Sequence, residues 1–161
     1  MAFNKAELCA RLDDLRRVDA KAVSPGGEVL VKDRASETAL AESGAQESDA
    51  LAFEKAGWTF VKPGGYVASS GHHDVVVDSD GRLKVVGHAL NVRFDPTLSR
   101  KDADDILGRY GLSIRREMGF APNLFLVTGA QTDAVSKAKL LNGLESVVYA
   151  EPVLIEPIEG R

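Results

Sequence analysis

The chain has 161 residues, enough for one domain of ordinary size or two small ones, and folding would bury about 70% of its unfolded surface. Its formal net charge of −4 argues against a nucleic-acid partner, because proteins of that class normally present a basic face. A single cysteine, Cys9, excludes an internal disulfide. The sequence contains neither the apolar core of a signal peptide nor a membrane-spanning run, so we expect a soluble chain without a membrane partner, cytoplasmic or secreted after removal of a signal.

The first expected element is a helix from Asn4 to about Arg17. Asn4 precedes Glu7 by three residues, which is the spacing of a capping box at a helix N-terminus. Leucines then recur at helical spacing, and Cys9 beside them is interpreted as a small core or boundary residue. The leucine stripe consists of Leu8, Leu12 and Leu15.

The remainder of the N-terminal half alternates short strands with a helix that is interrupted at Gly44. Turn residues separate these elements, and Asp78-Ser79-Asp80-Gly81 predicts the turn of a β-hairpin. The expected elements are a strand at Glu28–Lys32, helix at Ser36–Ala56, a strand at Trp58–Val61, a further stretch at Tyr66–Ser70, and hairpin strands at Val75–Val77 and Leu83–Val86.

The second half of the chain carries the clearest pattern. Ser99 lies three residues before Asp102 and is expected to cap a helix that Gly111 ends. In order, the segments are a strand at Leu90–Phe94, a helix at Ser99–Tyr110, strands at Leu112–Glu117 and Leu124–Thr128, a helix at Asp133–Asn142 and a strand at Val147–Ala150. This order predicts an α+β fold of the ferredoxin-like, split βαβ type, with two helices on one face of a four-stranded antiparallel sheet.

The expected domain organisation follows from this difference between the two halves. Residues 1–85 form a smaller α/β accessory region with helices, short strands and a hairpin. Residues 86–158 form the ferredoxin-like domain, and residues 159–161 are a C-terminal tail.

Two strands of the second half are apolar on both sides, at Leu124–Val127 and at Val147–Tyr149. A sheet covered on one face should instead alternate apolar and polar side chains. Either the N-terminal half covers the second face, or a partner protein does, since large apolar patches tend to be interaction sites.

Motifs that carry chemistry are weak. In His72-His73-Asp74 the adjacent histidines of a strand would point to opposite faces, which does not suit chelation of one ion. The turn Asp78–Gly81 resembles the opening of a calcium loop, but Ala89 stands where the bidentate glutamate belongs. Ser69 and Ser70 lie in no nucleophile elbow, and the glycine pairs form no phosphate-binding fingerprint. We therefore expect no catalytic residue, no metal site and no cofactor.

Four segments of the second half form a pattern that recurs in a known family: Leu90–Phe94, Tyr110–Leu112, Pro122–Val127 and Val147–Pro152. With these segments, residues 90–156 resemble the propeptide domain of subtilisin-like serine proteases. The last segment is the most specific, since a Val-x-Tyr-x-Glu ending of the fourth strand recurs in these propeptides. The motifs of the protease catalytic domain are absent from the sequence, so the chain resembles the propeptide alone.

The resemblance implies an inhibitor and intramolecular chaperone of a subtilisin-like serine protease, without catalysis of its own. The open sheet face would pack on two surface helices of the protease, with Glu151 at their N-termini. Val153 stands where the family often has a second acid, which would weaken this cap. The residues implied to contact the protease are Phe125, Val127, Tyr149 and Glu151.

The resemblance also implies that the tail lies extended in the active-site cleft, with Arg161 in the primary pocket. The tail residues are Ile158, Glu159, Gly160 and Arg161. Ile-Glu-Gly-Arg is also a common engineered cleavage sequence, so both origins stay open. Action in cis or in trans is open too, as are two alternatives that keep the fold: a small-ligand regulatory module and a structural oligomer.

Overall fold

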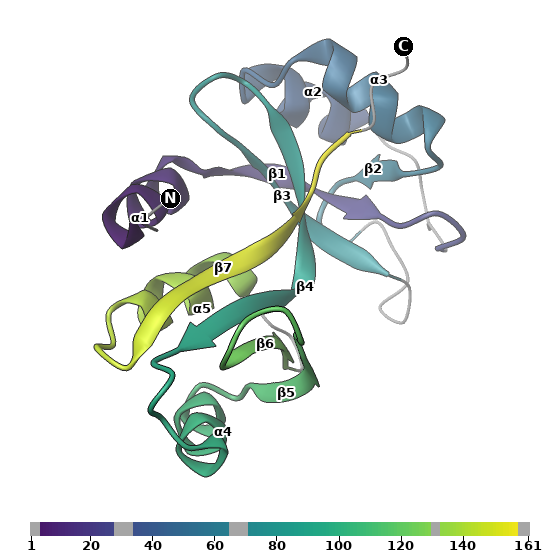
Figure 1. Ribbon diagram of the computed structural model, residues 1–161. Coiled ribbons are helices and arrows are strands. Elements are labelled where there is room, and N and C mark those ends of the chain that lie inside the picture. The colour runs from purple at the N-terminus through teal and green to yellow at the C-terminus, as the bar shows by residue number, and fades with distance from the viewer. Residues whose placement is uncertain (1–3, 28–33, 65–70, 130–132, 158–161) are drawn as a thin grey trace. The chain divides into compact units, whose positions relative to one another are not determined.

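The computed structural model describes residues 4–27, 34–64, 71–129 and 133–157 (Figure 1). Within these residues it is an α+β protein, with five helices and a mostly antiparallel, open seven-stranded sheet. The helices are α1 Lys5–Asp14, α2 Arg34–Glu42, α3 Glu47–Lys55, α4 Arg100–Arg109 and α5 Ala134–Asn142. The strands are β1 Arg16–Val23, β2 Thr59–Val61, β3 His72–Val77, β4 Leu83–Phe94, β5 Ser113–Glu117, β6 Leu124–Thr128 and β7 Val147–Ile155.

The chain divides into two compact units. Unit 1 contains the described residues up to Asp13 together with Gly87–Val153, and unit 2 contains Asp14–Val86 together with the described residues from Leu154 onward. The boundaries fall inside β4 and inside β7, so each of these strands contributes to both units.

Unit 1 contains the predicted order of elements, β4, α4, β5, β6, α5 and β7. In its part of the sheet β5 pairs with β6, β6 with β4, and β4 with β7. The predicted cap of α4 is confirmed, because the Ser99 hydroxyl accepts a hydrogen bond from the Asp102 backbone N–H at 3.1 Å. The helix ends before Gly111, whose φ of 73° lies in the left-handed region that glycine adopts without steric cost.

The N-terminal helix is shorter than the sequence predicted. α1 ends at Asp14, and the chain then continues as strand β1, which the sequence analysis did not predict. Leu8 and Leu12 of the predicted stripe are buried. The strand was hidden because the buried side chains that alternate along it are short and two are alanines, so the apolar signal is weak: Val18, Ala20 and Ala22.

In unit 1, the first residue of α1 connects this helix to the segment between α5 and β7. The Lys5 ammonium donates hydrogen bonds to the backbone carbonyls of Leu144, at 3.1 Å, and Val147, at 2.7 Å. The Lys139 ammonium of α5 lies 3.5 Å from the Asp13 carboxylate at the other end of the helix. The N-terminal helix is therefore tied to α5 and to the start of β7.

In unit 2, α2 packs against β1 and β2 (Figure 1). Gly44, with a φ of 81°, separates α2 from α3, as the sequence predicted. The Phe53 ring meets the rings of Trp58 and Phe60 edge to face, with centroids 6.0 and 5.9 Å apart. These aromatic side chains join the apolar residues of β1, β3 and β4 in one core.

The predicted hairpin is confirmed, since Val77 of β3 lies opposite Leu83 of β4. The sequence suggested two separate strands at Leu83–Val86 and Leu90–Phe94, whereas the structure has one strand of 12 residues. β7 likewise continues past Ala150 to Ile155. The predicted strand at Glu28–Lys32 and the stretch Tyr66–Ser70 lie outside the described residues.

Candidate functional site

The sheet of unit 1 has one fully buried face. Val92 of β4 lies opposite Phe125 of β6, and Leu90 lies opposite Val127. Directly opposite residues of an antiparallel pair project from the same side of the sheet. All four side chains are at most 2% exposed, so this face forms the interior of the unit.

Two of the four residues expected to contact a protease lie in this buried face. Phe125 is 2% exposed and Val127 is not exposed at all. The Arg100 guanidinium of α4 lies 5.3 Å above the centre of the Phe125 ring, so a helix covers this face. Because the two side chains are already packed inside the unit, neither is available at a surface, and any docking face must use the opposite side of β6.

The opposite side of β6 carries Leu126, which is partly exposed. Leu126 lies opposite Asn91 of β4 and opposite Arg116 of β5. On this side β6 also carries Leu124, which is buried and lies opposite Arg93, so the face mixes apolar side chains with polar and charged ones. Its mixed chemistry is that of a surface, in contrast to the wholly apolar interior on the other side.

Tyr149 and Glu151, the other two expected contact residues, alternate along β7 and are both partly exposed. The pKa of Tyr149 is raised by burial and by the charge of Glu151, and the Arg93 guanidinium works in the opposite direction. Tyr149 therefore lies near both Glu151 and Arg93. Burial also raises the pKa of Glu151, with the nearby Arg11 guanidinium offsetting part of this effect.

Arg93, which lies near Tyr149, has an unsatisfied hydrogen-bond donor among the described residues. Its Nε is buried and, within the described part of the chain, has no hydrogen-bond partner. A buried donor without a partner is costly, and so is a carboxylate that has lost part of its hydration. We call Arg93, Leu126, Tyr149 and Glu151 the outer face of unit 1. Glu151 is partly exposed, so its carboxylate can accept hydrogen bonds from donors on a partner surface.

Neither Arg93 nor Leu126 was predicted from the sequence as a contact residue. The signal for Arg93 was present, because it alternates with Val92 and Phe94, which are buried. Leu126 was hidden because every residue from Leu124 to Val127 is apolar, which gives no indication of which side faces the interior.

The histidine cluster has structural partners. Asp74 pairs with the Lys21 ammonium and with the Arg17 guanidinium, the latter at 3.5 Å. The His73 Nδ1 lies 3.0 Å from the Val86 carbonyl, and its ring meets Trp58 with centroids 5.4 Å apart. No group of side chains suited to a metal ion occurs among the described residues. Over the same residues, no helix has the length and apolar character needed to cross a membrane.

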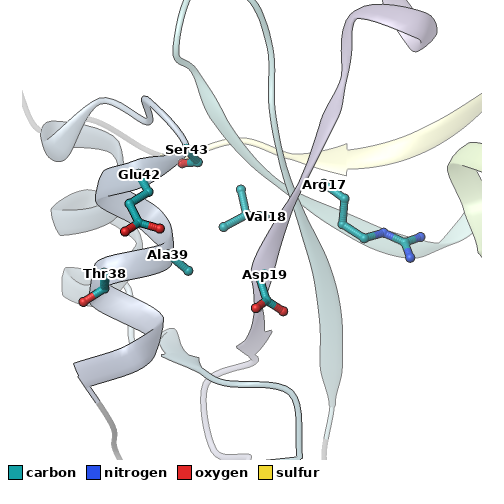
Figure 2. A pocket seen from close by; sticks show the side chains of 7 residues that line it. All are labelled: Arg17, Val18, Asp19, Thr38, Ala39, Glu42 and Ser43. Atoms are coloured by element: carbon teal, nitrogen blue, oxygen red, sulfur yellow. The ribbon is translucent and has the colours of Figure 1, made fainter.

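Unit 2 contains a groove between β1 and α2 with a volume of about 450 Å³. Figure 2 shows Val18 of β1 and Ala39 of α2 in the space between the two elements. The remaining lining residues are Arg17, Asp19, Thr38, Glu42 and Ser43. No residue of this groove was singled out from the sequence, because its two walls lie about twenty positions apart in the chain.

The tail residues Ile158, Glu159, Gly160 and Arg161 lie outside the described residues. The segment just before them belongs to unit 2, where Ile155 packs against the apolar core. The Glu156 carboxylate lies 3.1 Å from the Lys84 ammonium.

Comparison with protein-family models, curated proteins and solved structures found no significant match. A functional proposal therefore rests on the residues of the chain and on their geometry.

Proposed function

We propose that the chain is the propeptide of a subtilisin-like serine protease, acting as its inhibitor and folding chaperone. Unit 1 would be the ferredoxin-like domain of this propeptide. The order of its elements and its strand order, β5-β6-β4-β7, agree with that topology. The proposal makes the chain a binding protein and assigns it no catalysis.

The observation that carries the proposal is the position of Glu151. Its carboxylate lies on the outer face, where burial raises its pKa, with Tyr149 beside it on the same strand. The free N–H groups at a helix N-terminus, with the positive end of the helix dipole, are suited to receive such a carboxylate. Docking on two protease helices would thus supply hydrogen bonds to the Glu151 carboxylate.

The proposed contact keeps Tyr149 and Glu151 and uses Leu126 in place of the buried Phe125 and Val127. Leu126 and Tyr149 would supply the apolar contact area of the docking surface. The tail, Ile158–Arg161, would then enter the cleft as an added strand and block it.

Both roles follow from the same binding free energy. A partner that binds the folded protease stabilises it by mass action. If the partner also binds the transition state for folding, it speeds folding.

The test is inhibition of a panel of subtilisin-like proteases by the full chain and by a chain that ends at Glu156. Tight inhibition that weakens on truncation supports docking with the tail in the cleft. Equal inhibition by both chains retains the outer face and removes the tail from the proposal. If the folded chain inhibits no protease of the panel, the proposal is wrong, and self-association through the outer face becomes the next candidate.

A further inference from the structure

Strand β1 has one edge that is paired over only part of its length. In the sheet, β2 and β3 lie on opposite sides of β1. β2 pairs only with Lys21–Val23, whereas β1 begins at Arg16. Within the described chain, no strand pairs with the segment from Val18 to Ala20 on the side of β2. An edge of this kind presents backbone N–H and C=O groups to any extended chain that reaches it.

Helix α2 packs against β1, and residues of the two elements form the walls of the groove shown in Figure 2. Val18, which is 4% exposed, and Ala39, which packs against the same apolar core, provide the apolar part of its lining. A volume of about 450 Å³ lies in the range of ligand-binding pockets. A strand edge beside a helix, with an apolar floor, is the arrangement that receives peptides by strand addition.

The polar lining of the groove is acidic. Asp19 of β1 and Glu42 of α2 are exposed, and neither carboxylate forms an ion pair within the described part of the chain. Figure 2 shows the Arg17 side chain directed away from α2, and its guanidinium lies 3.5 Å from Asp74. The groove thus combines an apolar floor with two carboxylates on opposite walls, and its cationic neighbour is engaged elsewhere.

We propose that this groove binds an extended peptide segment with a lysine or arginine side chain, which adds as a strand to the free edge of β1. The aliphatic stem of that side chain would lie on Val18 and Ala39, and its cationic end would meet Asp19 and Glu42. Peptide backbone groups would pair with the segment from Val18 to Ala20. The ladder with β3 shifts register between Arg17 and Lys21, so the segment from Val18 to Ala20 is outside the regular pairing on that side too. This site lies within unit 2 and does not depend on the proposed protease contact.

Isothermal titration calorimetry measures the affinity of the full chain for short peptides that are acetylated at the N-terminus and amidated at the C-terminus. The first peptide is Ala-Val-Lys-Val-Ala, the second carries Glu in place of Lys, and the third is the lysine peptide with alternate amides N-methylated. We expect the lysine peptide to bind, and each of the other two to bind at least about tenfold more weakly. Amide exchange should slow at Val18, Asp19 and Ala20 when the lysine peptide is present.

Two variants locate the site. The double substitution Asp19→Asn with Glu42→Gln should weaken binding of the lysine peptide by about tenfold or more. Glu37→Gln removes an equally exposed carboxylate of the same helix that does not line the groove, and it should leave binding unchanged. Circular dichroism verifies that each variant is folded.

Three results would overturn the proposal. The first is no binding of the lysine peptide at millimolar concentration by the folded chain. The second is equal affinity for the lysine and glutamate peptides, or for the N-methylated one. The third is concentration-dependent dimerisation that Ala39→Arg abolishes, because the occupant would then be a second copy of the chain.

Discussion

The Arg82 guanidinium and the Asp49 carboxylate form a bidentate ion pair in unit 2. Arg82 Nε and Nη2 each lie 2.9 Å from a different oxygen of Asp49. The same carboxylate accepts a hydrogen bond from the Leu83 backbone N–H at 3.0 Å. Asp49 is completely buried, so its charge is compensated by these three donors, which join α3 to the start of β4.

Replacement of Asp49 by alanine should lower the free energy of unfolding by about 2–4 kcal/mol, because Arg82 and a buried N–H lose their acceptor. Arg82 is 41% exposed and can be rehydrated, so the loss should fall short of that for a fully buried pair. Urea unfolding followed by the fluorescence of Trp58 measures the effect. Glu47→Ala, which removes an exposed carboxylate in the first turn of the same helix, is the matched control and should change stability by less than about 0.5 kcal/mol. Equal losses in both variants would contradict a special role for Asp49.

Asn142 should be nearly as sensitive, for a different reason. Its side-chain amide donates to the Ala150 carbonyl at 2.8 Å and accepts from the Ala150 N–H at 2.7 Å. This places a side chain where a neighbouring strand would otherwise pair with β7. Asn142→Ala should lower the free energy of unfolding by about 2–3 kcal/mol, because two buried backbone groups lose their partners. Asn142→Asp keeps the size of the side chain but removes its donor, so it should also destabilise; stability equal to the parent in urea unfolding would contradict this account.

Local chemistry made much of unit 1 predictable. Ser99, Gly111 and the alternation of Leu90 with Val92 each report on a few neighbouring residues, and the structure confirms the elements that they indicated. β1 was missed because alanines contribute little to an apolar pattern. The continuity of β4 was missed because Gly87 and His88 interrupt its apolar run, although strand pairing extends the strand through them.

The outer face could be predicted only in part. The motif pointed to Tyr149 and Glu151, which are partly exposed, whereas Phe125 and Val127, which were expected at the surface, are buried. When every residue of a strand is apolar, the sequence does not indicate which alternating set of side chains faces the interior. Only tertiary packing determines which side of the strand is covered. The partners of Asp49 and the groove beside β1 depend on residues far apart in sequence, and no local pattern reports on them.

The raised pKa of Glu151 gives a pH dependence of definite sign. Its ordinary value is 4.5, and burial raises it in the folded chain, so the folded state retains the proton to higher pH than the unfolded state. Stability associated with this group is therefore present below pH 4.5 and is lost as the pH rises through the folded pKa. Glu151→Gln cannot ionise and should lack this loss.

Urea unfolding of the parent chain and of Glu151→Gln is measured from below pH 4.5 to neutrality. The quantity of interest is the difference between their free energies of unfolding at each pH. This difference cancels other titrating groups, including Asp14 and Asp95, whose pKa values are lowered by hydrogen bonds from Ser79 and Thr97. We expect Glu151→Gln to gain stability relative to the parent as the pH rises. A difference that does not vary with pH would show that Glu151 is solvated in the folded chain.

Adjacent residues of β6 should separate binding from folding. Leu126 is on the outer face and partly exposed, whereas Val127 is completely buried. Val127→Ala should lower the free energy of unfolding by about 2 kcal/mol through loss of buried contacts, while the folded fraction should inhibit a sensitive protease as well as the parent does. Leu126→Ala should change stability by less than about 1 kcal/mol but should weaken inhibition by about tenfold, because its loss falls on the docking surface. Inhibition constants corrected for the folded fraction, together with urea unfolding, provide both readouts. The opposite result, in which Val127→Ala impairs inhibition by the folded protein and Leu126→Ala does not, would reject the outer face as the contact surface even if the protease is the true partner.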